Sequence, residues 1–177
     1  MYFIKQLKED FIIKGVKQLT LDTQQDFRGE IWTTYTDVDF LPNFEEDKLS
    51  ISSHSVLRGL HGDSDIDKLI TCMHGKIQLG IADLRKNSPT YGNSIMLELS
   101  SENPTSIFVP AGCVNGHLCL SDKCLFFYKW SKKYNGADKQ VTINYKDPKF
   151  NFKWNLENVI MSERDIEKSI NSDGVFL

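Results

Sequence analysis

Hydrophobic and polar residues alternate along much of the central chain. The segment KIQLGIADL (76–84) places Ile77, Leu79 and Ile81 on one face of an extended strand, which is typical of a half-buried β-strand. Similar short runs occupy residues 48–53, 68–73, 94–99, 105–109, 124–131 and 141–145. Turn-forming Gly, Pro and Asn residues separate these runs, which predicts a β-sandwich or barrel. No central connection is long enough for a crossover helix, which argues against a parallel α/β fold.

One short helix is predicted near the C-terminus, beginning after Ser162 and reaching toward Ile170. Asp165 follows three residues after Ser162, as in a capping box, so it has a structural role open to it besides orienting a histidine. Residues 37–47 carry Pro42, Asn43 and several acidic residues and are predicted to form a loop. The 177 residues fit one all-β domain, 1–177, with a short C-terminal helix.

Composition and charge exclude several functional classes. With 40% hydrophobic and 25% charged residues, the chain is neither disordered nor collagen-like. A net charge of -3, with no basic arm, gives no electrostatic reason to expect a nucleic-acid partner. No apolar run approaches the roughly 18 residues of a membrane helix, and the start MYFIKQLKED is too charged for a signal peptide. We therefore predict a cytoplasmic protein with no membrane partner.

The cysteines lie among apolar residues and show no CxxC spacing, which indicates buried free thiols rather than a zinc site. They are Cys72, Cys113, Cys119 and Cys124.

His61 is the first candidate for chemistry. It lies in LRGLHGD between two glycines and close to Arg58, where the backbone can approach a ligand and a guanidinium can hold a phosphate. A tight hairpin with a structurally satisfied histidine is the alternative. His54 and His74 lie at expected strand ends or turns and are predicted to be ordinary surface residues.

His117 follows the glycine-rich segment PAGCVN and is more ambiguous. A metal could in principle be held by His61, His117 and a carboxylate, as in metal-binding β-barrels with an H-x-H pair. The chain has no H-x-H pair, and Asn115 occupies the position where a later histidine ligand would fall. We therefore predict no metal site.

Arginine is scarce: the chain has four arginines and 17 lysines. Arg28 in DFRGE and Arg58 in LRGLH both adjoin glycine and could clamp a diphosphate through paired donors, or could form ordinary surface ion pairs. Tyr128 shares a strand face with Phe126 and Trp130, so it points into either the core or a cavity.

Seven segments carry a resemblance to a known family. They are DFRGEIW (26–32), VLRGLHGD (56–63), KLITCMHG (68–75), DLRKNSPTYG (83–92), IFVPAGCVNGH (107–117), YKWSKKY (128–134) and MSERD (161–165). In this order they resemble the nucleotide-4-keto-sugar 3,5-epimerases, the family of dTDP-4-dehydrorhamnose 3,5-epimerase. The resemblance implies a cupin jelly-roll barrel, a homodimer, and catalysis without metal or other cofactor.

The resemblance also implies residue roles. His61 would be the base that removes a proton next to the C4 ketone of the sugar, with Asp165 supporting its charge. Lys68 would stabilise the enolate oxygen, and Tyr128 would return a proton from the opposite face. The implied substrate-binding residues are Arg28 and Arg58 on the diphosphate, with Asn115, His117 and Lys48.

Departures from the family pattern affect the predicted substrate. The interval from His61 to Lys68 is short, VNGH replaces AHGF, and Glu46 and Lys48 stand near the usual Gln and Asn. These features resemble a bacterial capsule branch that epimerises GDP-4-keto-heptoses at C3, or at C3 and C5. We predict that activity, with three alternatives: dTDP-4-dehydrorhamnose 3,5-epimerisation, a 3,4-ketoisomerase cupin, and a non-catalytic module that binds a sugar or nucleotide.

Overall fold

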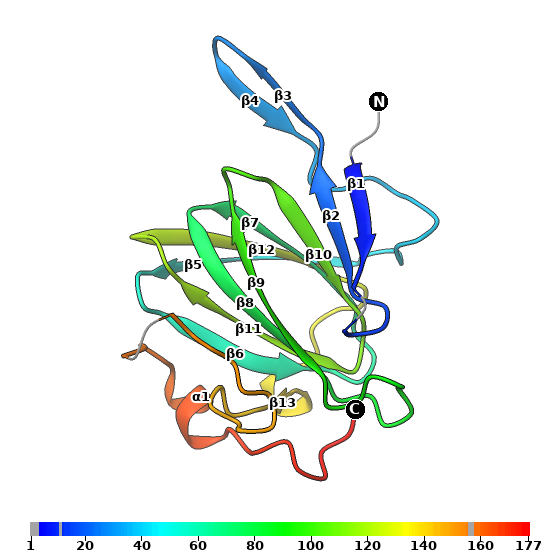
Figure 1. Cartoon of the computed structure of the whole chain (residues 1–177), viewed down its shortest axis with the longest axis vertical. Coiled ribbons are helices and arrows are strands. Elements are labelled where there is room, and N and C mark those ends of the chain that lie inside the picture. Colours follow the sequence, from blue (N-terminus) through cyan, green and yellow to red (C-terminus); the bar gives the residue numbers. More distant parts are fainter. Residues whose placement is uncertain (1–3, 11, 156–157) are drawn as a thin grey trace.

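The computed structural model describes residues 4–10, 12–155 and 158–177, and these form two antiparallel sheets and one separate hairpin (Figure 1). The larger sheet has the order β1 (Ile4–Glu9), β2 (Lys17–Leu21), β10 (Thr105–Val109), β7 (Lys68–His74), β12 (Lys123–Trp130) and β5 (Glu46–Ser53). The smaller sheet has the order β13 (Val141–Thr142), β6 (Leu57–Gly62), β11 (Cys113–Cys119), β8 (Lys76–Asp83) and β9 (Ser94–Ser100). The hairpin joins β3 (Thr23–Asp26) to β4 (Gly29–Trp32).

The main core lies between the two sheets. Ile70 and Ile107 from the larger sheet and Leu79 and Ile81 from the smaller sheet are fully buried in one cluster. Removing each such side chain from water stabilises the fold by about 1.5–3 kcal/mol. The apolar residues of the alternating pattern are therefore buried between the two sheets, and the all-β prediction is confirmed.

The outer face of β8 corrects one prediction. The pattern in this strand predicts a single buried face, but β8 is buried on both faces beyond its first residue. The segment around Phe152 and Trp154 covers the second face, and a Cβ on Gly80 would meet the Trp154 ring at 3.0 Å. Gln78 is satisfied there, because its amide donates to the Lys153 carbonyl at 3.2 Å. A polar residue in a strand therefore did not mark a solvent face.

The C-terminal elements are shorter than predicted. Helix α1 (Glu163–Glu167) begins after Ser162, whose hydroxyl accepts the backbone N–H of Asp165 at 3.2 Å, so the predicted N-cap is confirmed. The helix ends before Ile170, whose N–H donates to the Thr142 carbonyl of β13 instead of to a helical carbonyl. Strand β13 ends at Thr142 instead of 145, since Asn144 forms a turn by accepting the N–H of Lys146.

All four cysteines are free and buried, as predicted. Burial raises the pKa of Cys72 to about 11 and that of Cys113 to about 12, so both remain neutral thiols at physiological pH. Among the described residues, no helix has the length and apolar character needed to cross a membrane.

Candidate active site

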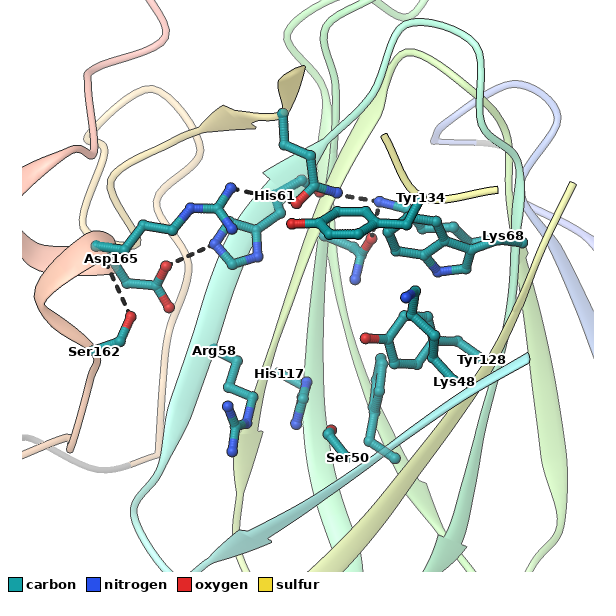
Figure 2. A pocket seen from close by; sticks show the side chains of 15 residues that line it. Lys48, Ser50, Arg58, His61, Lys68, His117, Tyr128, Tyr134, Ser162 and Asp165 are labelled. Carbon is teal, nitrogen blue, oxygen red and sulfur yellow. Dashed lines mark hydrogen bonds and ion pairs between the residues drawn. The ribbon is translucent and has the colours of Figure 1, made fainter. Parts of the chain in front are cut away.

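A pocket of about 370 Å³ opens between the two sheets beside α1. Strands β5, β6, β7, β11 and β12 and the start of α1 all contribute side chains to it (Figure 2). The two-residue period of a strand explains how this happens, because residues two apart share a face. Lys48 and Ser50 enter from β5 in this way, and Phe126, Tyr128 and Trp130 enter from β12.

A partly exposed His61 and a buried Asp165 form a pair at one side of the pocket. His61 Nε2 lies 2.6 Å from Asp165 Oδ1, and only 4% of the Asp165 side chain is exposed. Burial works to raise the pKa of Asp165, but the hydrogen bond and charge of His61 and the Gly59 N–H at 3.2 Å hold it below its ordinary value. An ionised carboxylate only accepts hydrogen bonds, so it fixes the Nε2–H tautomer and leaves Nδ1 as the basic atom.

Gly59 allows this arrangement on β6. It has a φ of +110°, and a Cβ there would lie 2.7 Å from the Asn115 carbonyl oxygen of β11. The close approach of β6 to β11 brings His61, Asn115 and His117 to one wall. The hairpin alternative for His61 is wrong, because His61 lies inside strand β6.

Lys68 is a buried cation facing the pocket. Its Nζ lies 3.3 Å from Asp63 Oδ2, 3.4 Å from Asn115 Oδ1, and 5.4 Å from the centre of the Trp130 ring. Desolvation lowers the pKa of Lys68, and the Asp63 charge opposes that change. A buried ammonium of this kind can stabilise an oxygen on which negative charge develops.

Tyr128 lies on the larger sheet, across the pocket from the sheet that carries His61. Its ring packs between Phe126 and Trp130, with ring centres 5.1 Å and 5.7 Å away. Desolvation raises the pKa of the Tyr128 phenol, so the hydroxyl is neutral at physiological pH and can donate a proton.

Three buried polar atoms in the pocket wall have no partner among the described residues. They are Ser50 Oγ, His117 Nε2 and Trp130 Nε1. The His117 ring stacks on Phe126 with centres 3.9 Å apart, and burial, aided by the Arg58 charge, lowers its pKa to about 3. An unpaired buried polar group is unfavourable by about 1–3 kcal/mol. These atoms therefore favour a ligand rich in polar groups.

Arg58 and Lys48 supply positive charge at this pocket. Arg58 pairs in register with His117 across β6 and β11, and its Nε donates to Ser52 Oγ at 3.0 Å. Lys48 forms an ion pair with Glu46, and its Nζ lies 5.1 Å from the centre of the Trp130 ring. Two cations at the edge of a polar pocket suit an anionic ligand.

The structure brings together every predicted site residue except Arg28. Arg28 lies in the turn of the β3–β4 hairpin, where its side chain is 71% exposed and pairs with Asp26. The hairpin projects from the sandwich in Figure 1, and Arg28 lines a separate surface hollow. The prediction that Arg28 joins the other site residues is therefore not met within a single chain.

Sequence reasoning missed several lining residues. They are Ser50, Tyr134, Gln140, Ser162 and Arg164. Ser50 had a usable signal, because it lies two residues after Lys48 on the same strand. Tyr134 and Gln140 come from irregular segments, and no sequence period reports where such residues lie. In the part of the chain that the structure describes, no three His, Cys, Asp or Glu side chains converge as a metal site requires.

Comparisons with known proteins identify the family of the chain. The sequence profile of the family described as dTDP-4-dehydrorhamnose 3,5-epimerase matches residues 10–172. The chain is 37% identical over 150 residues to dTDP-4-dehydrorhamnose 3,5-epimerase of Methanothermobacter thermautotrophicus, which covers 79% of this chain and 80% of that protein. It is 33% identical over 135 residues to the enzyme of the same name from Shigella flexneri, covering 73% and 74%.

Solved structures add the fold. The crystal structure of dTDP-4-dehydrorhamnose 3,5-epimerase from Elizabethkingia anophelis NUHP1 superposes with a TM-score of 0.86 at 28% identity, covering 99% of this chain and all of that one. That of dTDP-6-deoxy-D-glucose-3,5-epimerase from Legionella pneumophila Philadelphia 1, in complex with dTDP-4-keto-L-rhamnose, gives 0.87 at 26% identity, covering 97% of both chains. The predicted jelly roll is confirmed. These relatives are named for dTDP sugars, so they favour the dTDP alternative over the GDP-heptose prediction. The chain belongs to the dTDP-4-dehydrorhamnose 3,5-epimerase family and is an isomerase of nucleotide sugars.

Proposed function

We propose that the protein inverts C3 and C5 of a dTDP-linked 4-keto-6-deoxy sugar through an enolate intermediate. The observation that carries the proposal is the His61–Asp165 pair at 2.6 Å, which shares one pocket with Lys68 and Tyr128. The family match and the dTDP-4-keto-L-rhamnose bound by the Legionella relative support a dTDP-linked substrate.

The first step is removal of the proton at C3 by Nδ1 of His61. A proton next to a ketone is weakly acidic, so the step needs a well-placed base and a positive group at the oxygen. The C3–H bond breaks, its electron pair forms the C3=C4 double bond, the carbonyl π pair moves to the C4 oxygen, and the proton stays on His61. Asp165 stabilises the resulting imidazolium, and the Lys68 ammonium stabilises the enolate oxygen.

The second step is protonation of C3 from the opposite face by Tyr128. Inversion requires separate groups on the two faces of the ring, because a single base would mostly restore the starting configuration. His61 on β6 and Tyr128 on β12 belong to different sheets, which supports this division of roles. Protonation at C3 re-forms the C4 ketone. The Tyr128 phenolate then regains a proton from solvent, His61 releases its proton to solvent, and the same sequence at C5 completes the second inversion.

The remaining pocket residues bind the substrate in this scheme. Arg58 and Lys48 supply charge for the diphosphate, and Asn115 and His117 hydrogen-bond the sugar nucleotide. The three unpartnered polar atoms of the wall, on Ser50, His117 and Trp130, support a polyhydroxylated ligand. No cofactor takes part in the scheme, and a cytoplasmic location remains a prediction.

The exposed hairpin supports the predicted homodimer. Phe27 at its tip is 98% exposed and Ile31 is 74% exposed, while Leu49 and Ile51 are more than half exposed on edge strand β5. Covering such apolar side chains with a second copy is favourable. Arg28 would then reach the diphosphate in the pocket of the partner subunit instead of its own.

Complementation tests this role of Arg28. Arg28→Ala and His61→Asn chains are each expected to be nearly inactive alone, and mixed dimers formed by refolding them together should regain activity. Mixed dimers that remain inactive, or a monomer in light scattering, would contradict the arrangement.

Incubation with a small substrate panel in D₂O, followed by NMR, tests the activity itself. We expect deuterium at C3 and C5 of the dTDP-linked 4-keto-6-deoxy sugar. A GDP-linked 4-keto-heptose forms the second arm, and faster exchange there would restore the GDP-heptose prediction. Movement of the carbonyl to C3 would indicate a ketoisomerase, and binding without exchange would indicate a binding module.

A further inference from the structure

Asp63 is a buried carboxylate behind the pocket. It follows His61 by two residues, is only 5% exposed, and faces Lys68 Nζ at 3.3 Å. Gln140 holds the same carboxylate oxygen, because its side-chain amide donates to Asp63 Oδ2 at 2.9 Å. Nothing in the proposed reaction uses this carboxylate directly.

The contacts continue from Asp63 to α1. Arg164 on α1 donates to Gln140 Oε1 at 3.3 Å, and is itself held by the Ala137 carbonyl at 3.1 Å and Thr142 Oγ1 at 3.3 Å. Arg164 adjoins Asp165, the partner of His61. The short helix α1 thus contacts the histidine through one residue and the lysine through a chain of hydrogen bonds that ends at Asp63.

We propose that Asp63 is the positioning residue of Lys68, keeping its ammonium charged and directed at the sugar carbonyl. The inference rests on the proposed function, since it gives Lys68 the enolate oxygen to stabilise. It extends that function to a carboxylate that contacts neither the substrate nor the reacting atoms.

The physical argument starts from burial. A buried ammonium loses its hydration and shifts toward the neutral amine unless an opposite charge compensates it. Among the described residues, Asp63 is the only carboxylate in ion-pair contact with Lys68. The other groups facing Lys68 are the His61 carbonyl, the Asn115 amide and the Trp130 ring, which carry no charge.

Cys113 is the remaining titratable group near Lys68. Burial raises the pKa of the Cys113 thiol to about 12, so this thiol carries no charge at the pH of the reaction. The charge that retains the proton on Lys68 is therefore that of Asp63, and Gln140 fixes the position of this carboxylate.

The experiment compares Asp63→Asn with Asp65→Asn. Asn keeps the shape of the carboxylate and removes its charge. Asp65 lies in the same connection but pairs with exposed Lys132 at the surface, so its variant matches the charge change away from the pocket. Two quantities are measured: the titration of the Lys68 amine by NMR, assigned with Lys68→Arg, and the pH profile of kcat/KM.

For Asp63→Asn, we expect the Lys68 titration and the alkaline limb of kcat/KM to move down by at least one pH unit, about the effect of one close opposite charge. At a pH above the wild-type alkaline limb, kcat should fall at least tenfold with KM within threefold. Asp65→Asn should match the wild-type chain within twofold, and its alkaline limb should not move.

An unchanged Lys68 titration in Asp63→Asn, or equal effects in both variants, would overturn the inference. If Asp63→Asn does not fold, Asp63→Glu keeps the charge, and an alkaline limb displaced by a unit in that variant would equally refute it. The NMR titration needs no turnover. If Asp63→Asn shifts the Lys68 titration but the wild-type chain exchanges no deuterium into the substrate, the proposed function alone would be refuted.

Discussion

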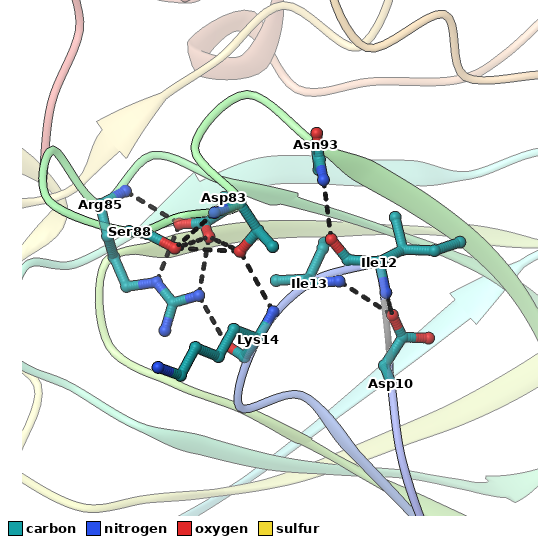
Figure 3. Close-up of polar contacts among 9 residues, drawn as sticks. Asp10, Ile12, Ile13, Lys14, Asp83, Arg85, Ser88 and Asn93 are labelled. Carbon is teal, nitrogen blue, oxygen red and sulfur yellow. Dashed lines mark hydrogen bonds and ion pairs between the residues drawn. The ribbon is translucent and has the colours of Figure 1, made fainter.

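Two regions of this protein bury polar atoms, but they differ in whether those atoms have hydrogen-bond partners. At the end of β8, the buried Asp83 carboxylate accepts hydrogen bonds from the backbone and guanidinium of Arg85 and from the hydroxyls of Ser88 and Thr90 in the following loop (Figure 3). In the pocket, Ser50 Oγ, His117 Nε2 and Trp130 Nε1 are equally buried and have no partner among the described residues. Satisfied hydrogen-bonding groups mark the first region as structural, and unsatisfied groups in the second region favour a ligand there.

The loop region also fastens a distant segment. Arg85 donates to the Lys14 carbonyl at 2.7 Å, and the Lys14 N–H donates to Thr90 at 3.1 Å. Asn93 reaches the Ile12 carbonyl at 2.9 Å in the same way (Figure 3). The motif DLRKNSPTYG belongs to the family resemblance as much as LRGLHGD does. Family motifs therefore mix residues that hold the fold with residues that face the substrate.

The first prediction breaks the comparison on the pocket side. Replacing His61 with Asn removes the base and should lower the rate of deuterium incorporation by about 10²–10⁴-fold. The melting temperature should stay within a few degrees, because the Asn amide can still donate toward Asp165. NMR measures the rate of deuterium incorporation, and thermal unfolding measures the melting temperature. Wild-type exchange in His61→Asn would remove His61 from the mechanism.

The second prediction separates the two faces of the sugar. Tyr128→Phe should lower the formation of inverted product by about 10²-fold, because the opposite-face acid is lost. Deuterium exchange with retained configuration should fall much less, since His61 can still remove and return a proton. Phe keeps the packing between Phe126 and Trp130, so the fold serves as an internal control. Equal losses of exchange and inversion would contradict the assignment.

Much of the fold was predictable because burial on one face leaves a period of two in the sequence. The run at 94–99 lies within β9, where Ile95 and Leu99 are buried and Glu98 is exposed, and the run at 124–131 covers most of β12, where Phe126 and Trp130 are buried. Strands β6 and β11 gave no such signal, since their glycines allow close backbone contact and interrupt the alternation. The cover over β8 was also invisible, because it depends on Phe152 and Trp154, about 70 residues away in the chain.

The site was predictable where the residues lie on strands with a recognisable motif. Lys68 and Tyr128 are examples: the family resemblance implied a role for both at the substrate, and both line the pocket. The chain of contacts through Asp63 and Gln140 was not predictable, because it joins irregular segments about 77 residues apart. Arg28 was misplaced for a different reason: the β3–β4 hairpin that carries it projects from the two sheets, and the motif does not report where that hairpin points.

The third prediction breaks the comparison on the structural side. The hydrogen bonds of Arg85, Ser88 and Thr90 outweigh burial and lower the pKa of Asp83 from 3.8 to about 2. Such a carboxylate stabilises the fold above its unfolded-state pKa, near 4, and loses that contribution as the pH falls toward 2. Asp83→Asn should therefore lower the free energy of unfolding by about 2 kcal/mol at pH 7, with kcat unchanged.

Denaturant unfolding at pH 7 and pH 3 checks the third prediction. The gap between the wild-type chain and Asp83→Asn should narrow at the lower pH. Asp173→Asn makes the same charge change at an exposed position and should leave the free energy of unfolding within about 0.5 kcal/mol. A gap that widens toward pH 3 would contradict the sign of the argument.

The smallest expected effect sharpens the comparison at a single atom. His117→Phe keeps a flat ring against Phe126 but removes the unpartnered Nε2. Loss of one hydrogen bond to the substrate is worth about 1 kcal/mol, so KM should rise by roughly five- to tenfold while kcat stays within twofold. The free energy of unfolding should stay the same or rise slightly, since an unsatisfied buried group is gone. Because the pKa of His117 is about 3, its effect on KM should be constant from pH 5 to 8 by steady-state kinetics. A loss of stability with unchanged KM would make His117 a core residue like those around Asp83 and would end the distinction between the two regions.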